Sequence, residues 1–239
     1  MKSKTRNVTS HPHLLPTPRP GRRERHRVEM RDRIYRAALR LFAERGFLET
    51  TVEDITEAAD VGKGTFFNYF PTKEHVLGCY GQERIHEIER SLERARGGKP
   101  VLSVLKDLAT DLAGQSSESP DLLRSVFAAN LSCAPVRAEL QRRIQRSREL
   151  LGEIFAIGQE RGEVRPDISP TELGRMVRLI FMGVTIAWAI NPEGSLRGTA
   201  ERVWELLCPS LQPESALTCA SGSPAKSKSI RHSRRKGES

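Results

Sequence analysis

The stretch TTVEDITEAADVGKGTFFNYFPTKEHVL, residues 50–77, decides the fold, because it predicts two short helices on either side of a tight break. The first of these helices begins near Thr51, whose hydroxyl is placed to cap the helix start. Asp54 stands three residues further on, in the position of a capping box. The residues expected to face the core are Val52, Ile55 and Ala58 or Ala59.

The break falls at Asp60-Val61-Gly62, and a second helix is predicted from Lys63 to Phe70. Pro71 ends this helix, and Thr72 is a natural cap for the one that follows. Two short helices separated by three or four residues, the second preceded by glycine, predict a helix-turn-helix motif.

A longer helix before the motif is predicted from about Val28 to Arg45, because apolar residues recur there at helical spacing. Gly46 supplies its C-terminal stop. The first two helices would anchor the third, whose outer face then fits the major groove of DNA. The anchoring residues are expected to be Leu41, Phe42, Phe47, Val52, Ile55, Ala59, Val61 and Phe70.

The start of the third helix has the composition of a DNA-contacting surface. Gly62 and Gly64 remove bulk there, so that backbone amides can approach a phosphate closely. Lys63 suits a guanine edge or a phosphate, and Asn68 suits an adenine or a phosphate. These residues are therefore candidates for contacts to bases and backbone.

The aromatic residues of this helix allow two interpretations, since aromatic side chains at helical spacing usually belong to a core. We expect Phe66 and Phe70 to be buried, and Phe67 and Tyr69 to face outward. The Phe67 ring or the Thr65 methyl group would then pack on a thymine methyl group. The Tyr69 hydroxyl would donate to a phosphate, which fixes register without reading sequence.

The stretch from Arg33 to Leu77 closely resembles the DNA-binding head of the TetR family of bacterial regulators. The resemblance is carried by several separate features of the sequence. They are the end of the first helix at Arg45-Gly46-Phe47, the Thr-Thr-Val start at 50–52, the Gly-Lys-Gly-Thr entry at 62–65 and the Tyr-Phe-Pro-Thr-Lys-Glu exit at 69–74.

The resemblance implies a role for individual residues. Thr51 and Lys73, both at helix starts, are expected to contact phosphates. The family often has a tyrosine where Phe67 stands, so this sequence is expected to lose one polar contact there and to shift its base preference. The groove-facing surface implied by the family consists of Lys63, Gly64, Thr65, Phe67, Asn68 and Tyr69.

Helical periodicity continues through the rest of the chain, and no convincing strand alternation occurs. The sequence predicts an all-α fold of about nine helices, with a three-helix DNA-binding head and a helical body for dimerisation and ligand binding. The helices expected in the body are 73–96, 101–116, 120–132, 135–161, 170–190 and 195–207, the last bounded by Pro209. The expected domains are a flexible basic arm at 1–27, the head at 28–72, the body at 73–209 and a disordered basic tail at 210–239.

The two most apolar late segments, Pro170–Ile190 and Ser195–Leu207, are the expected dimer surface. The resemblance supports this interpretation, because the family pairs its last two long helices across a two-fold axis. The alternative is that the same residues form the core of the monomer, and some must do both. The residues concerned are Met176, Val177, Ile180, Phe181, Val184, Trp188, Val203, Trp204 and Leu207.

The resemblance also implies a ligand pocket in the body, whose occupation moves the fourth helix, here Lys73–Arg96, and separates the heads. Pocket residues are expected on Val101–Ser116, Leu122–Cys133 and Gln141–Gln159, with no individual residue assigned. A dense basic run lies in the last of these segments. Its members, Arg142, Arg143, Arg146 and Arg148, are expected to form a solvated helix face rather than an anion site.

Positive charge is concentrated at the two ends of the chain. The formal net charge is +9, and residues 1–30 hold eight Lys or Arg against two acids, while residues 222–239 hold six against one. Basic ends attract polyanions through a sequence-independent, salt-sensitive term. This charge leaves open an architectural DNA-binding protein held by its tails.

Several other classes of protein fit the sequence poorly. Cys79, Cys133, Cys208 and Cys219 lack the spacing of a zinc site, and no export signal is present, which favours a reducing cytoplasm. No catalytic motif is evident, so neither an enzyme nor a cofactor is expected; His75 and His86 share a helix without a carboxylate or cysteine at ligand spacing. The longest apolar stretch, Leu179–Ile190, is 12 residues long, against about 20 for a membrane span, and is expected to be a buried helix.

The sequence therefore predicts a cytoplasmic, sequence-specific transcriptional regulator, namely a repressor released from a palindromic operator by a small molecule. A regulator without a ligand and an activator remain alternatives. The expected partners are double-stranded operator DNA, a second copy of the chain and a small-molecule effector, with no membrane.

Overall fold

The computed structural model describes residues 21–116 and 119–213, and this part of the chain forms nine α-helices and no strand. The predicted all-α fold is confirmed. The parts of the predicted basic arm and tail at 1–20 and 214–239 lie outside the described residues. The helices are α1 (Arg22–Arg45), α2 (Val52–Ala58), α3 (Lys63–Tyr69), α4 (Lys73–Arg96), α5 (Val101–Ser116), α6 (Pro120–Ser132), α7 (Ala134–Glu160), α8 (Pro170–Ile190) and α9 (Leu196–Leu211).

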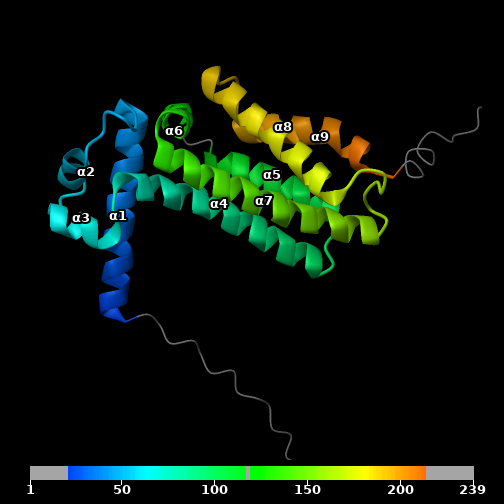
Figure 1. Cartoon of the computed structure of the whole chain (residues 1–239), viewed down its shortest axis with the longest axis horizontal. Coiled ribbons are helices and arrows are strands. Elements are labelled where there is room, and N and C mark those ends of the chain that lie inside the picture. Colours follow the sequence, from blue (N-terminus) through cyan, green and yellow to red (C-terminus); the bar gives the residue numbers. More distant parts are fainter. Residues whose placement is uncertain (1–20, 117–118, 214–239) are drawn as a thin grey trace, which may run out of the picture.

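The helices form a small head and an elongated body (Figure 1). Helices α1 to α3 lie at one end of the molecule, and α4 leads away from them along the body beside α7. Helix α8 packs on α7, while α9 packs on α5. Helix α6 contacts α1 and so joins the body to the head.

The first helix begins at Arg22, six residues before the predicted start at Val28. The prediction that 22–27 belong to a flexible arm is therefore wrong. Arginine and glutamate favour helix, and Glu24 lies in the first turn, where a negative charge suits the helix dipole. Residues 22–27 are all exposed, so they carry no apolar period by which the sequence could reveal them as helical.

The last helix also extends beyond its predicted end. It runs through Pro209, the residue expected to stop it, to Leu211. Proline removes one backbone donor, but here only in the final turn, and other contacts hold that turn. The Arg165 backbone N–H donates to the Leu211 carbonyl at 2.9 Å, and the Arg165 guanidinium donates to the Ser210 carbonyl at 3.1 Å.

The apolar core of the head continues into the body. Phe42, Phe66 and Phe70 fill the centre of the head and are almost completely buried. The same cluster takes in residues of α4, α6 and α7, namely Val76, Leu77, Ala129 and Val136. The Phe47 backbone N–H also donates to the Ser125 hydroxyl of α6 at 2.8 Å. Head and body are therefore in direct, well-packed contact.

Helix α8 is exposed over much of its apolar surface. It is long and apolar enough to cross a membrane by length and composition, with a mean hydropathy of 1.6 in its most apolar window, of which 28% is buried. One such helix is weak evidence for a span. The prediction that Leu179–Ile190 is a buried helix is wrong for Leu179, Ile180 and Ile190, which are exposed.

The predicted dimer residues divide between the interior and the surface. Val177, Trp188 and Trp204 are buried in the monomer, whereas Met176 and Ile180 are exposed. The remaining ones, Phe181, Val184, Val203 and Leu207, are half-buried. Among the described residues, nothing covers this outer apolar side of α8, and exposed apolar patches of this kind commonly mark interaction surfaces.

Candidate nucleic-acid interface

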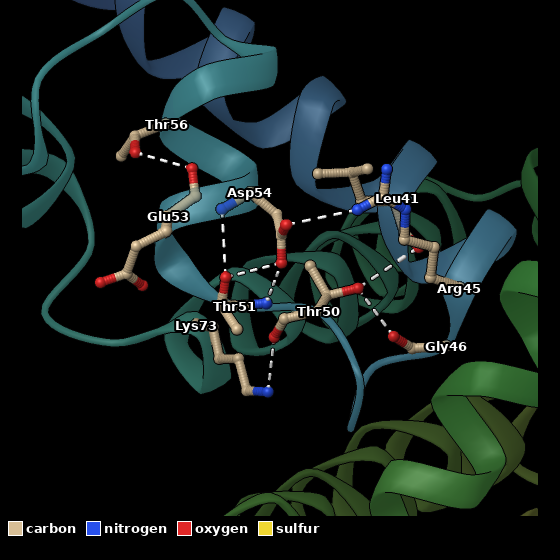
Figure 2. A network of polar contacts seen from close by, with 9 residues as sticks. All are labelled: Leu41, Arg45, Gly46, Thr50, Thr51, Glu53, Asp54, Thr56 and Lys73. Carbon is tan, nitrogen blue, oxygen red and sulfur yellow. Dashed lines mark hydrogen bonds and ion pairs between the residues drawn. The ribbon is translucent and has the colours of Figure 1, made fainter.

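The start of α2 is fixed by the predicted capping box, which Figure 2 shows from close by. The Asp54 backbone N–H donates to the Thr51 hydroxyl at 3.1 Å. The Asp54 carboxylate accepts in return from the Thr51 backbone N–H at 2.8 Å and from its hydroxyl at 2.6 Å. These hydrogen bonds from Thr51, followed by the charge of Arg45, lower the pKa of Asp54. Both donors of Thr51 are therefore directed at Asp54.

The turn between α2 and α3 lies where the sequence predicts it, but glycine does not make it. Asp60 adopts the left-handed conformation with φ of 50°, which aspartate tolerates better than most residues. Gly62 has an ordinary φ of −75° as the N-cap of α3. The Val61 backbone N–H donates to the Thr56 carbonyl at 3.0 Å, and Arg33 of α1 donates to the Asp60 carbonyl at 3.0 Å. The turn is thereby tied to α1.

In the part of the chain that the structure describes, no neighbouring atom requires glycine at 62 or 64. A Cβ atom added at either position would meet no atom within 4 Å, and both residues are exposed. Their backbone amides are therefore open to a molecule that approaches from outside.

Helix α3 buries one side and exposes the other. Phe66 and Phe70 are 0% and 1% exposed, which confirms their predicted place in the core. Phe67 is 51% exposed. The other predicted site residues divide into exposed Lys63, Gly64 and Asn68 and half-buried Thr65 and Tyr69. Six residues of the predicted surface thus lie on one seven-residue helix, and four of them are exposed, whereas Tyr69 packs partly against the core of the head.

Lys63 forms an ion pair with Glu53 of α2. The hydrogen bond from Lys63 lowers the pKa of Glu53. Both side chains are more than half exposed, so water and salt screen their attraction. The lysine ammonium is therefore available to a stronger anion.

Lys73 holds the loop between α1 and α2 against the start of α4. Its ammonium donates to the carbonyls of Phe47, Leu48 and Thr50 at 2.9, 3.2 and 2.7 Å. It also lies 4.7 Å from the centre of the Phe47 ring. Since an ammonium has three donors, its hydrogen bonds are complete. The phosphate contact implied for this side chain does not fit its surroundings, although the backbone N–H at the helix start can still serve a phosphate.

Thr72 does not act as the predicted cap of α4. It occupies the N-cap position, but its hydroxyl makes no capping hydrogen bond and instead lies 3.0 Å from Nδ1 of His75. The Thr72 hydroxyl thus interacts with the imidazole instead of a backbone amide of the first turn of α4.

Two further polar residues position the head and were missed in the sequence. Thr50 is fully buried, and its hydroxyl donates to the Gly46 carbonyl at 2.7 Å (Figure 2). The sequence signal that could have revealed Thr50 is its position four residues after Gly46, the predicted end of the first helix. No local signal exists for Ser125, since it meets Phe47 across 78 positions of sequence.

A cavity of about 250 Å³ lies within the body, lined by residues of α4 to α9. The predicted pocket helices all contribute to it, together with α4, α8 and α9. Within the described part of the chain, no group of three or more His, Cys, Asp and Glu side chains is placed to hold a metal ion.

Comparison with known proteins identifies the family. Residues 34–78 match the domain described as "Bacterial regulatory proteins, tetR family", and residues 83–209 match the C-terminal domain of "TetR/AcrR family transcriptional repressors". The chain belongs to the TetR family. Its members are transcriptional regulators rather than enzymes, and they bind DNA, dimerise and bind small molecules.

Three relatives span between 69% and 87% of this TetR-family chain. The transcriptional regulator TcmR of Streptomyces glaucescens is 45% identical over 215 residues, which cover 86% of this chain and 93% of the relative. The repressor DhaR of Mycobacterium sp. (strain GP1) is 28% identical, with 69% and 85% covered. The structure of Thermus thermophilus FadR with lauroyl-CoA is 31% identical, covers 87% of this chain and 100% of that one, and has a TM-score of 0.54.

Proposed function

We propose that the chain is a repressor that binds a palindromic operator as a homodimer in the cytoplasm and leaves it when a small molecule enters the body. The observation that carries the DNA-binding part is the outward face of α3, where Lys63, Phe67 and Asn68 are exposed while Phe66 and Phe70 anchor the helix from behind. The head would correspond to residues 22–72 and the body to 73–211.

The proposed DNA surface divides by chemistry. Lys63, Thr65, Phe67 and Asn68 face base edges or nearby phosphates, with the Gly62 and Gly64 amides beside them. Tyr69 and the helix starts at Thr51 and Lys73 contact the phosphates of the DNA backbone, and Lys73 does so through its backbone N–H. Because the backbone N–H and the hydroxyl of Thr51 both donate to Asp54, a phosphate that binds there would have to displace the Asp54 carboxylate.

The dimer is proposed from the outer side of α8. Met176, Leu179 and Ile180 are exposed at consecutive turns of this helix, and Gly183 leaves the same region flat. A second copy would cover this apolar face and bring two heads to two half-sites. The family habit of dimerisation supports the same partner.

Release by a small molecule is proposed because the wall of the cavity shares residues with the apolar cluster of the head. Leu77 of α4 and Val136 of α7 line the cavity and also pack in that cluster. A ligand that moves this part of α4 would therefore shift the head on which α3 is mounted. The Thermus thermophilus FadR structure contains lauroyl-CoA, which supports a ligand-binding body of this shape.

The test is a mobility-shift titration with operator DNA, taken from upstream of the gene or selected from random duplexes. At fixed salt, Lys63→Ala and Tyr69→Ala are expected to weaken binding, since each removes one contact on the α3 surface. Lys106→Ala, an exposed lysine of α5, is the matched control and should bind as the parent chain does. Unchanged affinity in both head variants would exclude this surface as the reader.

A further inference from the structure

The cavity in the body is lined by positively charged side chains but, among the described residues, by no aspartate or glutamate. The rest of its lining is mostly aliphatic and aromatic. The charged residues are Arg143 of α7 and Arg178 of α8, together with Arg84 of α4, which donates to the Leu112 carbonyl at 3.5 Å. Charge in an apolar surrounding is costly unless a counter-ion accompanies it. The lining therefore has the composition of a site for an anion.

Arg143 reaches from α7 across to α4. Its guanidinium donates to the Gly78 carbonyl at 3.2 Å, and a Cβ atom at position 81 would lie 2.0 Å from Nη1, so Gly81 makes room for it. Burial, before any other cause, lowers the pKa of Arg143. Glu139, the acid that acts on it from the same helix, is hydrogen-bonded to Arg142 at 3.0 Å. The prediction that the whole basic run is a solvated face is thus wrong for Arg143.

The guanidinium of Arg178 has fewer hydrogen-bond partners than that of Arg143. Its Nε atom is buried and has no hydrogen-bond partner, and Nη1 lies 3.8 Å from the sulfur of Met182, a weak acceptor. Burial followed by the charge of Arg175 lowers the pKa of Arg178. The acid on the same helix, Glu172, is paired with Arg175 at 2.6 Å. Arg178 therefore meets no carboxylate among the described residues.

A buried acceptor lies in the same cavity. The Oδ1 atom of Asn130 on α6 has no hydrogen-bond partner, and the residue is only 7% exposed. An unsatisfied buried amide of this kind costs free energy until a donor reaches it. A ligand that fills the cavity would therefore need a hydrogen-bond donor for Asn130 as well as a negative charge for the arginines.

We propose that this cavity binds an amphipathic anion: an apolar molecule whose carboxylate, sulfonate or phosphate group pairs with Arg143 and Arg178 and whose hydroxyl or amide N–H reaches Asn130. The volume of about 250 Å³ limits the enclosed part to a small molecule or one portion of a larger one. The inference rests on the proposed function only for the consequence of binding, since the binding itself is independent of DNA.

A matched pair of fluorescent probes tests the proposal on the full chain. Anilinonaphthalene sulfonate is an apolar anion, and N-phenylnaphthylamine is its neutral counterpart without the sulfonate. The full chain should bind the anionic probe in a saturable manner, and Arg178→Met and Arg143→Gln should each weaken it by about tenfold or more. Both variants should bind the neutral probe within about twofold of the parent chain, because its contacts are apolar. Arg148→Gln, at an exposed arginine of α7 that does not line the cavity, is the control and should leave both probes unaffected.

Thermal unfolding and DNA binding separate the possible outcomes. Arg178→Met without a probe should melt at or above the temperature of the parent chain, because it removes a half-buried cation whose Nε atom is buried without a hydrogen-bond partner. Equal binding of the anionic probe by the arginine variants, or equal loss of both probes, would overturn the anion site. Operator binding by the parent chain without a probe tests the proposed function separately: a chain that binds the anionic probe but no operator DNA would contradict the repressor and leave the anion site intact.

Discussion

At the scale of the residue, the head depends on a few hydrogen bonds with assigned donors and acceptors. Thr51 and Asp54 cap α2, and Lys73 ties the preceding loop to α4. The capping box was predictable because all its atoms lie within four residues. The role of Lys73 was not, since its acceptors are carbonyls 23 to 26 positions away, and carbonyls give no sequence signal.

The cap makes the stability of the head depend on pH. Since the hydrogen bonds from Thr51 lower the pKa of Asp54 below its ordinary value of 3.8, its carboxylate stabilises the fold above that pH. This contribution is lost as the pH falls through the lower pKa of the folded state. Urea unfolding of the parent chain and Asp54→Asn should therefore differ at neutral pH and converge in acid. A constant difference down to the acid limit would contradict the role of the carboxylate.

Lys73 and Lys63 should respond differently to substitution by methionine. Lys73→Met leaves three carbonyls without their donor and should lower the free energy of unfolding by about 1–3 kcal/mol. The salt dependence of its DNA binding should stay unchanged, because no phosphate contact is lost.

Lys63→Met supplies the comparison, measured by urea unfolding and by binding titrations at several salt concentrations. It should hardly affect unfolding but should reduce the salt slope by about one if Lys63 meets a phosphate. A reduced salt slope in Lys73→Met would assign its ammonium to DNA after all.

At the scale of the element, packing decides what periodicity leaves open. The sequence predicted that Phe66 and Phe70 are buried, because they are four residues apart and so lie on the same side of a helix. In the structure both pack against residues of α1 and α2 in the apolar cluster of the head. The extension of α1 to Arg22 has no apolar face and was invisible for that reason. Helix α9 passes Pro209 because Arg165 donates hydrogen bonds to Ser210 and Leu211, 45 and 46 residues later, and so holds the end of the helix.

The exposed side of α8 gives a prediction about association. Ile180→Glu places a charge in the proposed interface, so the variant should sediment as a monomer at concentrations where the parent chain is a dimer. Leu131→Glu, at a residue of α6 that is 77% exposed, should leave the dimer intact. A dimeric Ile180→Glu, or a monomeric Leu131→Glu, would place the interface elsewhere.

At the scale of the whole molecule, the head and body work through a shared core. Leu77 belongs to the head cluster and to the wall of the cavity, and Ser125 bonds to the loop after α1. The family resemblance predicted a pocket, but the sequence could not show which arginines line it. Residues 84, 143 and 178 come together only when α4, α7 and α8 pack in the folded chain.

The basic ends of the chain offer a test of the architectural alternative. Removal of residues 1–20 and 214–239 should lower DNA affinity and flatten its salt dependence, while preference for the operator over unrelated duplex persists. The measurement is a pair of titrations, one on each DNA, across a range of salt. Loss of all preference in the shortened chain would favour a protein held by its tails.

The most direct measurement compares operator and unrelated DNA at one salt concentration for the parent chain and Asn68→Ala. Asn68 is exposed on α3 and suits a base edge, so its loss should cut the ratio of the two affinities by about tenfold while binding to unrelated DNA hardly changes. A ratio equal to that of the parent chain would contradict the claim that this face of α3 reads the sequence.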